Sequence, residues 1–209
     1  MNWSIIEGRQ AFYTNLFRYD PGVDSGDIVD TFKFQITGRD SAETMHFKNT
    51  LAMKYLIERN IEGLVRNKFS LTKQDNSLEP TYYPKRTPRD GLIHWGQEVH
   101  VLERFIRAVT RPFSGAFTFS GSQMLRIWDA QAFDVHDFGY EKWPAGTVVA
   151  VFESGKFLVK CFGGLLLVNA SEADFPVEKG MRFGNNALEI KYFERNELGF
   201  FDIPEGLEG

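Results

Sequence analysis

A proline-rich stretch in the middle of the 209-residue sequence separates two parts with different hydrophobic periods. Three prolines lie among polar residues between positions 76 and 91, and proline can continue neither a helix nor an inner strand. We therefore predict a linker over residues 76–95. It divides the chain into a first domain over residues 1–75 and a second domain over residues 96–209.

The first part combines two strand-like runs with one long helix. Residues 11–19 and 29–36 are rich in β-branched and aromatic side chains, which favour strands. From about Ser41 towards Gly63 the apolar residues recur at helical spacing. The predicted order is strand, turn, strand and helix, with the helix packed on the strands.

The second part changes from one helix to short strands. Apolar residues at helical intervals predict a helix over residues 98–110, which Pro112 ends. Strands separated by glycine-containing turns are then predicted over residues 116–120, 125–133, 147–153, 156–162 and 165–170. Such strands on a short helix suggest a small antiparallel barrel, OB-like in form, although the number of strands does not separate a barrel from a sandwich.

Composition and charge exclude several classes of protein. No apolar run approaches the length that spans a bilayer, and residues 1–7 lack the features of a signal peptide, so we expect a cytoplasmic protein. Residues 96–209 hold 11 basic and 16 acidic residues, which disfavours a tRNA-binding surface. The single cysteine, Cys161, is expected to be a buried thiol, and the four histidines show no metal-ligand spacing, so we expect no metal.

An acidic turn lies between the two strand-like runs of the first part. Residues 23–29 read Val-Asp-Ser-Gly-Asp-Ile-Val, and Asp24 and Asp27 are ordinary residues for a tight connection. The turn also matches the folate-dependent formyltransferases, together with other segments in the same order. These are Asn2-Trp3, Lys85-Arg86-Thr87-Pro88-Arg89-Asp90, Ile93-His94-Trp95, Arg107-Ala108-Val109 and Arg111-Pro112-Phe113-Ser114-Gly115-Ala116-Phe117. Because the segments are colinear, the chain resembles this family over most of its length.

The nearest likeness within the family is to the sugar-nucleotide N-formyltransferases, with methionyl-tRNA formyltransferase as a more distant relative. The resemblance implies an α/β plus all-β fold: the C-terminal portion of a Rossmann-like formyltransferase domain, followed by a small OB-like antiparallel β-barrel domain. It implies transfer of a formyl group from 10-formyltetrahydrofolate to an amine, most simply the amino sugar of a sugar nucleotide. Two alternatives stay open: formylation of methionyl-tRNA, and a non-catalytic binding or assembly module.

The resemblance also assigns roles to the acidic turn. Asp24 matches the family's catalytic aspartate, which raises the pKa of a catalytic histidine. Asp20, Pro21, Gly22 and Val23 match, with Asp24, the loop that contacts the folate through main-chain groups. The family's catalytic asparagine and histidine precede this turn and would lie upstream of Met1. We therefore expect a truncated chain that is inactive alone, and a partner that is either the missing N-terminal half or a second copy in a homodimer.

The predicted linker holds a basic cluster with aromatic neighbours. Lys85, Arg86 and Arg89 fit either a solvated connector or a contact with the phosphate of a nucleotide sugar. Aromatic side chains at positions 82, 83 and 95 fit either the edge of a core or a platform on which a base could stack.

Overall fold

The chain forms two groups of densely contacting residues in a computed structural model that describes residues 1–22, 24–75, 77, 81–188, 195 and 201. Among these residues, the group that we call the sheet unit holds residues 1–8, 39–43 and 86–188. The rest form the hairpin unit. Both units are discontinuous in sequence, and the predicted domain boundaries at the linker stay a prediction.

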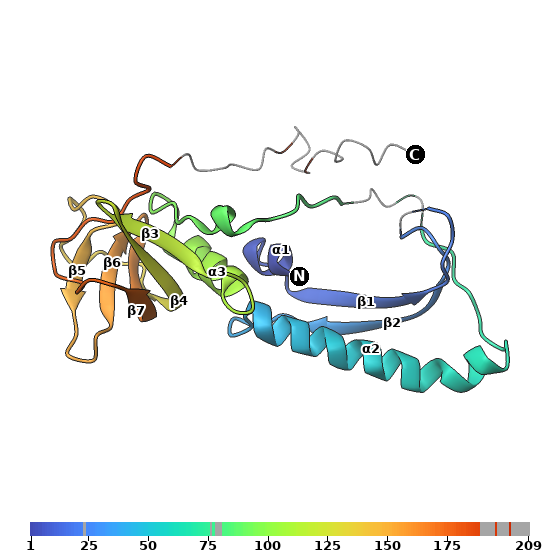
Figure 1. Cartoon of the computed structure of the whole chain (residues 1–209). Helices are drawn as coiled ribbons and strands as arrows, with labels where there is room; N and C mark the ends of the chain where they lie inside the picture. Colours follow the sequence, from blue (N-terminus) through green and yellow to red (C-terminus); the bar gives the residue numbers. More distant parts are fainter. Residues whose placement is uncertain (23, 76, 78–80, 189–194, 196–200, 202–209) are drawn as a thin grey trace. The chain divides into compact units, whose positions relative to one another are not determined.

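The hairpin unit contains the two predicted strands and most of the predicted helix. Strand β1 (Ala11–Phe17) pairs antiparallel with β2 (Ile28–Gln35), in a register that runs from Ala11 opposite Gln35 to Phe17 opposite Ile28. Helix α2 (Ala42–Val65) runs along this hairpin (Figure 1). The predicted strands and helix are thus confirmed to within a few residues.

Polar side chains tie the hairpin to α2. The carboxylate of Asp30 on β2 accepts hydrogen bonds from Arg59 Nε at 2.8 Å and from Asn60 Nδ2 at 2.7 Å. The hydroxyl of Thr14 on β1 donates to the side-chain oxygen of Asn49 at 2.7 Å. The pKa of Asp30 lies below its usual value, mainly because Arg59 donates hydrogen bonds to its carboxylate.

The sheet unit combines helices with one antiparallel sheet. Its helices are α1 (Asn2–Ile6), the 3₁₀ turn η1 (Pro88–Gly91) and α3 (Val99–Val109). Its strands are β3 (Ala116–Ser120), β4 (Gln123–Asp134), β5 (Val148–Val151), β6 (Phe157–Cys161) and β7 (Gly164–Ala173), in the order β3-β4-β7-β6-β5 (Figure 1). All five strands predicted from the glycine-punctuated pattern are present.

The predicted OB-like closed barrel is not confirmed. The ladder of strands ends at β3 on one side and at β5 on the other, and no closed barrel is found in the described part of the chain. Instead, a segment without regular structure lies against both ends of the ladder. The Gly184 and Phe119 main chains exchange hydrogen bonds of 2.8 and 3.0 Å at β3, and the Met181 carbonyl accepts the Val148 N–H at β5.

The core of the sheet unit lies between α3 and the sheet. Leu102 and Ile106 of α3 are fully buried, as are Leu125 and Ile127 of β4. Cys161 is also fully buried, and burial raises the pKa of its thiol to about 12, so it is an unreactive core residue as predicted. None of the described helices is long and apolar enough to cross a membrane.

We expect the substitution Asp30→Asn to loosen the hairpin unit in a pH-dependent way. The pKa of Asp30 is lowered in the folded chain, so its contribution to stability is present above the unfolded value of about 3.9. That contribution is lost as the pH falls through the lowered folded value. Urea unfolding at pH 7 and at pH 3 should show a destabilised variant at pH 7 and a smaller difference at pH 3. Equal differences at the two pH values would contradict the role given to this carboxylate.

Candidate functional site

The acidic turn that connects β1 and β2 is closed at its base by main-chain contacts. The Arg18 N–H donates to the Asp27 carbonyl at 2.9 Å, and the Arg18 guanidinium lies 3.8 Å from the Asp27 carboxylate. Gly26 lies against the same segment, since a Cβ atom there would come within 1.7 Å of the Arg18 carbonyl oxygen. Only glycine allows this approach.

Asp20 organises the outer part of the turn. Its Oδ1 accepts hydrogen bonds from the Ser25 hydroxyl at 2.7 Å and from the Gly22 N–H at 3.1 Å. A side chain at Gly22 would also collide with Ser25, at 2.0 Å from its Oγ. The carboxylate of Asp20 therefore shapes the loop, as aspartate does in many turns.

Asp24 has a strained backbone and an exposed side chain. Its φ angle is +54°, a left-handed conformation that aspartate tolerates better than most residues. Its carbonyl accepts a hydrogen bond from Gln74 Nε2 at 2.6 Å, and the same amide donates to the Gly26 carbonyl at 2.8 Å. Gln74 thus fixes the turn from a distant point in the chain.

The sequence interpretation missed Gln74, because it lies in a polar stretch without periodicity. The structure brings it to the turn through a bridge between Ile28 at the start of β2 and Thr72, whose main chains exchange two hydrogen bonds of 2.8 Å. A local sequence pattern cannot predict such a long-range bridge.

Four of the predicted site residues line a common cavity in the hairpin unit. The cavity has a volume of about 330 Å³ and is lined by Phe17, Tyr19, Asp20, Pro21, Gly22 and Asp24; we call it the turn cavity. Val23, the remaining predicted residue, lies outside the described residues. Tyr19, which was not predicted as a site residue, is 91% exposed and lines the same cavity as Pro21 and Gly22. This lining fits a planar ring recognised through main-chain groups.

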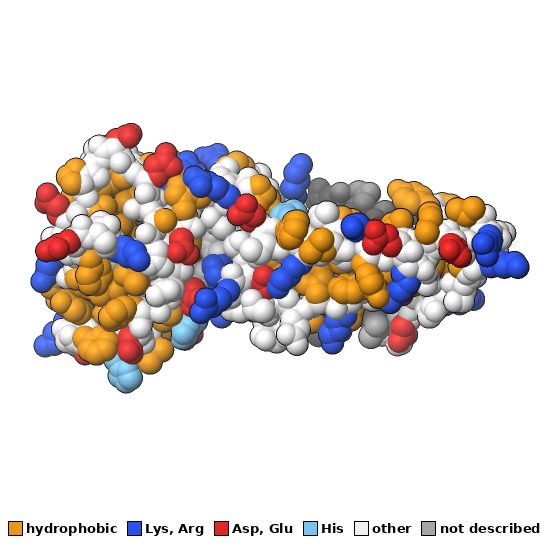
Figure 2. Space-filling view, turned by 90° about the horizontal axis from the view of Figure 1, so that it is seen from below, with side chains coloured by type: hydrophobic (Ala, Val, Ile, Leu, Met, Phe, Trp, Pro, Cys, Tyr) orange, Lys and Arg blue, Asp and Glu red, His pale blue; other side chains and the backbone are white. Residues whose placement is uncertain are grey.

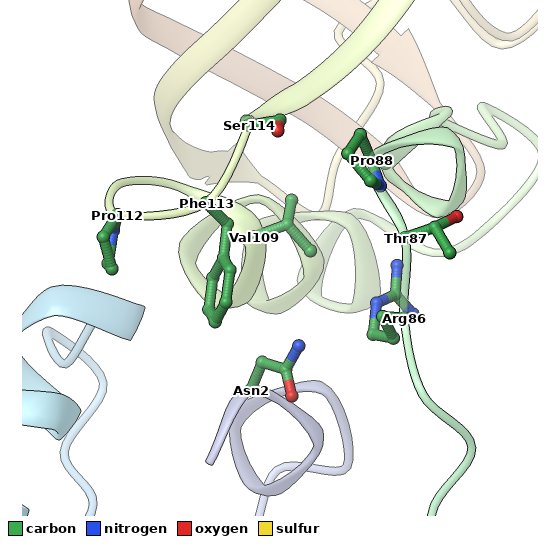
Figure 3. Close-up of a pocket in the computed structure, with 10 residues that line it drawn as sticks. Asn2, Arg86, Thr87, Pro88, Val109, Pro112, Phe113 and Ser114 are labelled. Carbon is green, nitrogen blue, oxygen red and sulfur yellow. The ribbon is translucent and has the colours of Figure 1, made fainter.

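A second cavity lies within the sheet unit, where four of the segments singled out in the sequence meet. It has a volume of about 390 Å³, and we call it the motif cavity. Its lining residues are Asn2, Arg86, Thr87, Pro88, Gly91, Val109, Pro112, Phe113, Ser114 and Gly115. Figure 3 shows Asn2 on α1, Val109 on α3, Arg86 and Phe113 around one common space.

Arg86 is held firmly beside this cavity. Its guanidinium lies 5.2 Å from the Trp3 ring and 5.4 Å from the Phe105 ring, and it donates to the Asp90 carbonyl. Burial lowers the pKa of Arg86, while the charge of Asp90 opposes that shift. Arginine nevertheless stays protonated in proteins, so the cavity carries a fixed positive charge. The alternative of a freely solvated connector is therefore wrong for Arg86.

Trp95, the last aromatic residue of the predicted linker, belongs to the core of the sheet unit. Trp95 is 5% exposed, stacks on Phe183 at 5.9 Å and donates its ring N–H to the Thr118 hydroxyl at 2.9 Å. Tyr83 lies 5.7 Å from Phe201. Trp95 is therefore no platform for a base. In the described residues no group of three His, Cys, Asp or Glu side chains could hold a metal ion.

Comparisons with known proteins agree with the order of these segments. Residues 85–183 match the profile of the formyl transferase C-terminal domain. The matched segment, a little under half of the chain, carries the features of this formyl transferase domain. The chain is 28% identical over 131 residues to the bifunctional polymyxin resistance protein ArnA of Wigglesworthia glossinidia brevipalpis. That alignment covers 63% of this chain and 20% of the ArnA protein, so the chain spans a minor part of its relative.

Solved structures share the fold of this chain. HypX from Aquifex aeolicus superposes with a TM-score of 0.64 at 16% identity, over 83% of this chain and 29% of HypX. The N-formyltransferase from Helicobacter canadensis, solved with folinic acid and dTDP-3-aminofucose, superposes with a TM-score of 0.62 at 19% identity. That match covers 81% of this chain and 59% of the Helicobacter enzyme.

We expect Gly26→Ala to disrupt the acidic turn, because the added methyl group must displace the Arg18 carbonyl. The free energy of unfolding should fall by more than about 1 kcal/mol, and amide signals of residues 18–27 should shift in NMR spectra. Gly38→Ala is the matched control, since a Cβ atom there meets nothing within 4 Å. If both variants behaved alike, the close approach at Gly26 would not be what shapes the turn.

Proposed function

We propose that this chain takes part in the transfer of a formyl group from 10-formyltetrahydrofolate to the amino group of a sugar nucleotide. The observation that carries the proposal is the turn cavity, where Asp20, Pro21, Gly22 and Asp24 lie together beside an exposed tyrosine. The match of residues 85–183 to the formyl transferase C-terminal domain supports the reaction class. The Helicobacter structure with folinic acid and dTDP-3-aminofucose supports the choice of co-substrate and acceptor, as does the HypX structure with tetrahydrofolic acid.

The proposed roles follow from the chemistry of the turn. The folate would supply the formyl group, and the main chain of Pro21 and Gly22, with Val23, would help to bind its ring. The carboxylate of Asp24 would stabilise the protonated form of a nearby histidine, because a negative charge raises the pKa of an imidazole. A protonated histidine can then donate a proton at neutral pH, and an asparagine can donate a hydrogen bond to the developing oxyanion.

We further propose that a polypeptide segment carrying this asparagine and histidine packs on the hairpin unit. Helix α2 supports this idea because it is apolar on more than one face. Met45, Ala52 and Leu56 are buried, while Met53 and Ile57 are each 45% exposed and Ile61 is 46% exposed. Figure 2, seen from the side of α2, shows hydrophobic side chains over this surface. A group of exposed apolar side chains on one surface often marks a site that another polypeptide covers.

The hairpin itself offers a second surface for this segment. A groove of about 730 Å³ lies between β2 and α2, with Phe32, Phe34, Leu51 and Tyr55 among its lining residues. Apart from the bridge between Ile28 and Thr72, no further strand pairs with β1 or β2 in the described residues. A two-stranded sheet with an open apolar side is a weak unit by itself. Further strands and an apolar layer would complete it.

Two alternatives rank below sugar formylation. The methionyl-tRNA formyltransferase of Clostridium thermocellum shares the fold, with a TM-score of 0.51, but residues 96–209 of this chain are acidic and offer phosphates a poor surface. A non-catalytic binding or assembly module would need neither the asparagine nor the histidine. The alternatives make opposite predictions for Asp24.

The first experiment is to sequence the gene region upstream of the Met1 codon. We expect a reading frame with an Asn-x-His motif before the position of Trp3, in frame or in a neighbouring gene. The encoded segment and this chain should together transfer a formyl group from 10-formyltetrahydrofolate to an amino-sugar nucleotide, as measured by mass spectrometry. Asp24→Asn should lower the rate by about a hundredfold or more, because it removes the charge that tunes the histidine. Absence of such a frame, or full activity of the variant, would favour the non-catalytic module.

The packing of the completing segment on α2 has its own test. The double variant Ile57→Glu, Ile61→Glu should raise the dissociation constant of the two polypeptides at least about tenfold, because it places charges in an apolar contact. The chain alone should stay folded by circular dichroism, since both side chains are half exposed in it. Lys54→Gln is the matched control on an exposed, charged part of the same helix. Unchanged affinity of the double variant would exclude this face of α2 from the contact.

A further inference from the structure

Gln74 connects the turn cavity to a distant segment of the chain, residues 72–75, which we call the strap. We propose that Gln74 is a positioning residue for formyl transfer. It holds the main chain of Asp24, so that the Asp24 carboxylate keeps one position beside the histidine whose pKa it raises. This role rests on the proposed function, because Gln74 acts through Asp24. Three observations support it: the hydrogen bonds of Gln74, the anchoring of the strap, and the state of the Asp24 carboxylate.

The side-chain amide of Gln74 ties two points of the turn together. Its Nε2 donates to the Asp24 carbonyl at 2.6 Å and to the Gly26 carbonyl at 2.8 Å. A glutamine amide has two N–H donors, so one side chain satisfies both carbonyls. Ionised glutamate and leucine have a similar size, but their side chains have no N–H group to donate. The pairing is therefore specific to the amide.

The strap is anchored on both sides of Gln74. Before it, Thr72 exchanges two main-chain hydrogen bonds of 2.8 Å with Ile28 at the start of β2. After it, the Asp75 carboxylate accepts hydrogen bonds from the Ser77 N–H at 2.9 Å and from the Ser77 hydroxyl at 2.6 Å. These contacts limit the freedom of the main chain that carries Gln74. Its side chain therefore loses less entropy when it bonds the turn.

The left-handed backbone of Asp24 needs such support. Its φ angle of +54° is a conformation that residues other than glycine adopt at a cost, so an unsupported turn would relax towards a commoner one. The main chain determines where the Cβ atom lies, and the carboxylate follows the Cβ atom. Because the interaction of two charges weakens with distance, a displaced carboxylate would raise the pKa of the histidine less.

The carboxylate of Asp24 differs from the other acidic groups of the turn and the strap. Asp20 and Asp75 accept hydrogen bonds from residues close to them in sequence, and Asp27 lies 3.8 Å from the Arg18 guanidinium. The Asp24 carboxylate is exposed and has neither a hydrogen bond nor an ion pair with any described residue. The contacts from Gln74 thus fix the main chain of Asp24 and leave its charge available for another group.

The first test uses the whole chain and the substitution Gln74→Glu, which replaces the two donors by carboxylate oxygens that face two carbonyls. We expect the pKa of the introduced carboxyl group to lie at least about one unit above the usual value of about 4.3, because neighbouring acceptors disfavour the charged form. NMR amide signals of residues 24–26 should differ from those of the unaltered chain at pH 7. At about pH 4.5 the difference should shrink, because the protonated carboxyl group can donate one hydrogen bond.

Gln74→Leu removes both donors at every pH and should shift the same amide signals. Lys73→Leu is the matched control, since Lys73 is an exposed residue of the same strap. Circular dichroism checks that each variant is folded. Unshifted turn signals in Gln74→Leu, equal shifts in Lys73→Leu, or an ordinary pKa for the carboxyl group of Gln74→Glu would overturn the positioning role, whatever reaction the chain takes part in.

The second test uses the complex of this chain with the segment that carries the asparagine and histidine. Gln74→Leu should lower the rate of formyl transfer about tenfold when Asp24 is present, but less than about twofold in the Asp24→Asn variant, because Gln74 acts through the Asp24 carboxylate. The rate falls at high pH as the histidine loses its proton. This fall should begin at lower pH in Gln74→Leu, since a less fixed carboxylate raises the pKa of the histidine less. A merely structural role would lower the rate without moving the pH profile.

Measurements on the complex also distinguish this role from the proposed function itself. No formyl transfer by the unaltered complex would reject the proposed function, and with it any catalytic use of the turn. If the unaltered complex is active, additive effects of Gln74→Leu and Asp24→Asn would reject the role of Gln74 alone. An unmoved pH profile of Gln74→Leu would do the same and leave the proposed function intact.

Discussion

Close approach of two main-chain segments at a glycine sets the shape of both cavities. At Gly26 the turn lies against the Arg18 carbonyl, so the base of the turn is narrow. At Gly91 a Cβ atom would come within 2.7 Å of the Gly115 carbonyl, so the two loops of the motif cavity touch at one end. Hydrogen bonds from Gln74 and Arg126 then fix the loops around these contacts. The side chains of each site are positioned by main chain, which is why the sites are compact.

Local sequence patterns predicted the helices and strands. Contacts between segments far apart in the sequence, which such patterns do not show, determine how these elements pair. The glycine pairs and β-branched runs were enough to find β3 to β7, and helical spacing was enough for α2 and α3. Closure of the sheet depends on pairing between segments far apart in sequence, and the predicted barrel is not confirmed for that reason. The same limit hid Gln74, which reaches the turn only through the bridge at Thr72. Motif colinearity placed Asp20, Pro21, Gly22 and Asp24 together, because they are adjacent in the chain.

Helices α2 and α3 differ in how much of their apolar surface is buried. Helix α3 has one apolar face, and its buried residues Leu102 and Ile106 lie against the sheet, while its other side carries charged residues such as Glu103 and Arg107. Helix α2 has buried apolar residues such as Leu56, but it also leaves apolar side chains such as Ile57 and Ile61 half exposed between charged ones. Helix α3 buries its apolar face within its own unit, whereas α2 leaves part of its apolar surface exposed. The sheet unit therefore buries the apolar face of its long helix, whereas the hairpin unit leaves apolar side chains of its helix exposed.

The segment that lies against both ends of the five-stranded sheet has a consequence for how the chain behaves among its neighbours. The outer main chain of β3 is occupied by Gly184, and that of β5 by Gly180 and Met181. Strands at the border of a sheet otherwise present rows of unpaired N–H and C=O groups, on which another polypeptide can add a strand. Here a short irregular stretch closes both borders without adding a strand of its own. Because these main-chain groups are already hydrogen-bonded, they cannot pair with a strand of another polypeptide. This disfavours aggregation through the edges of the sheet.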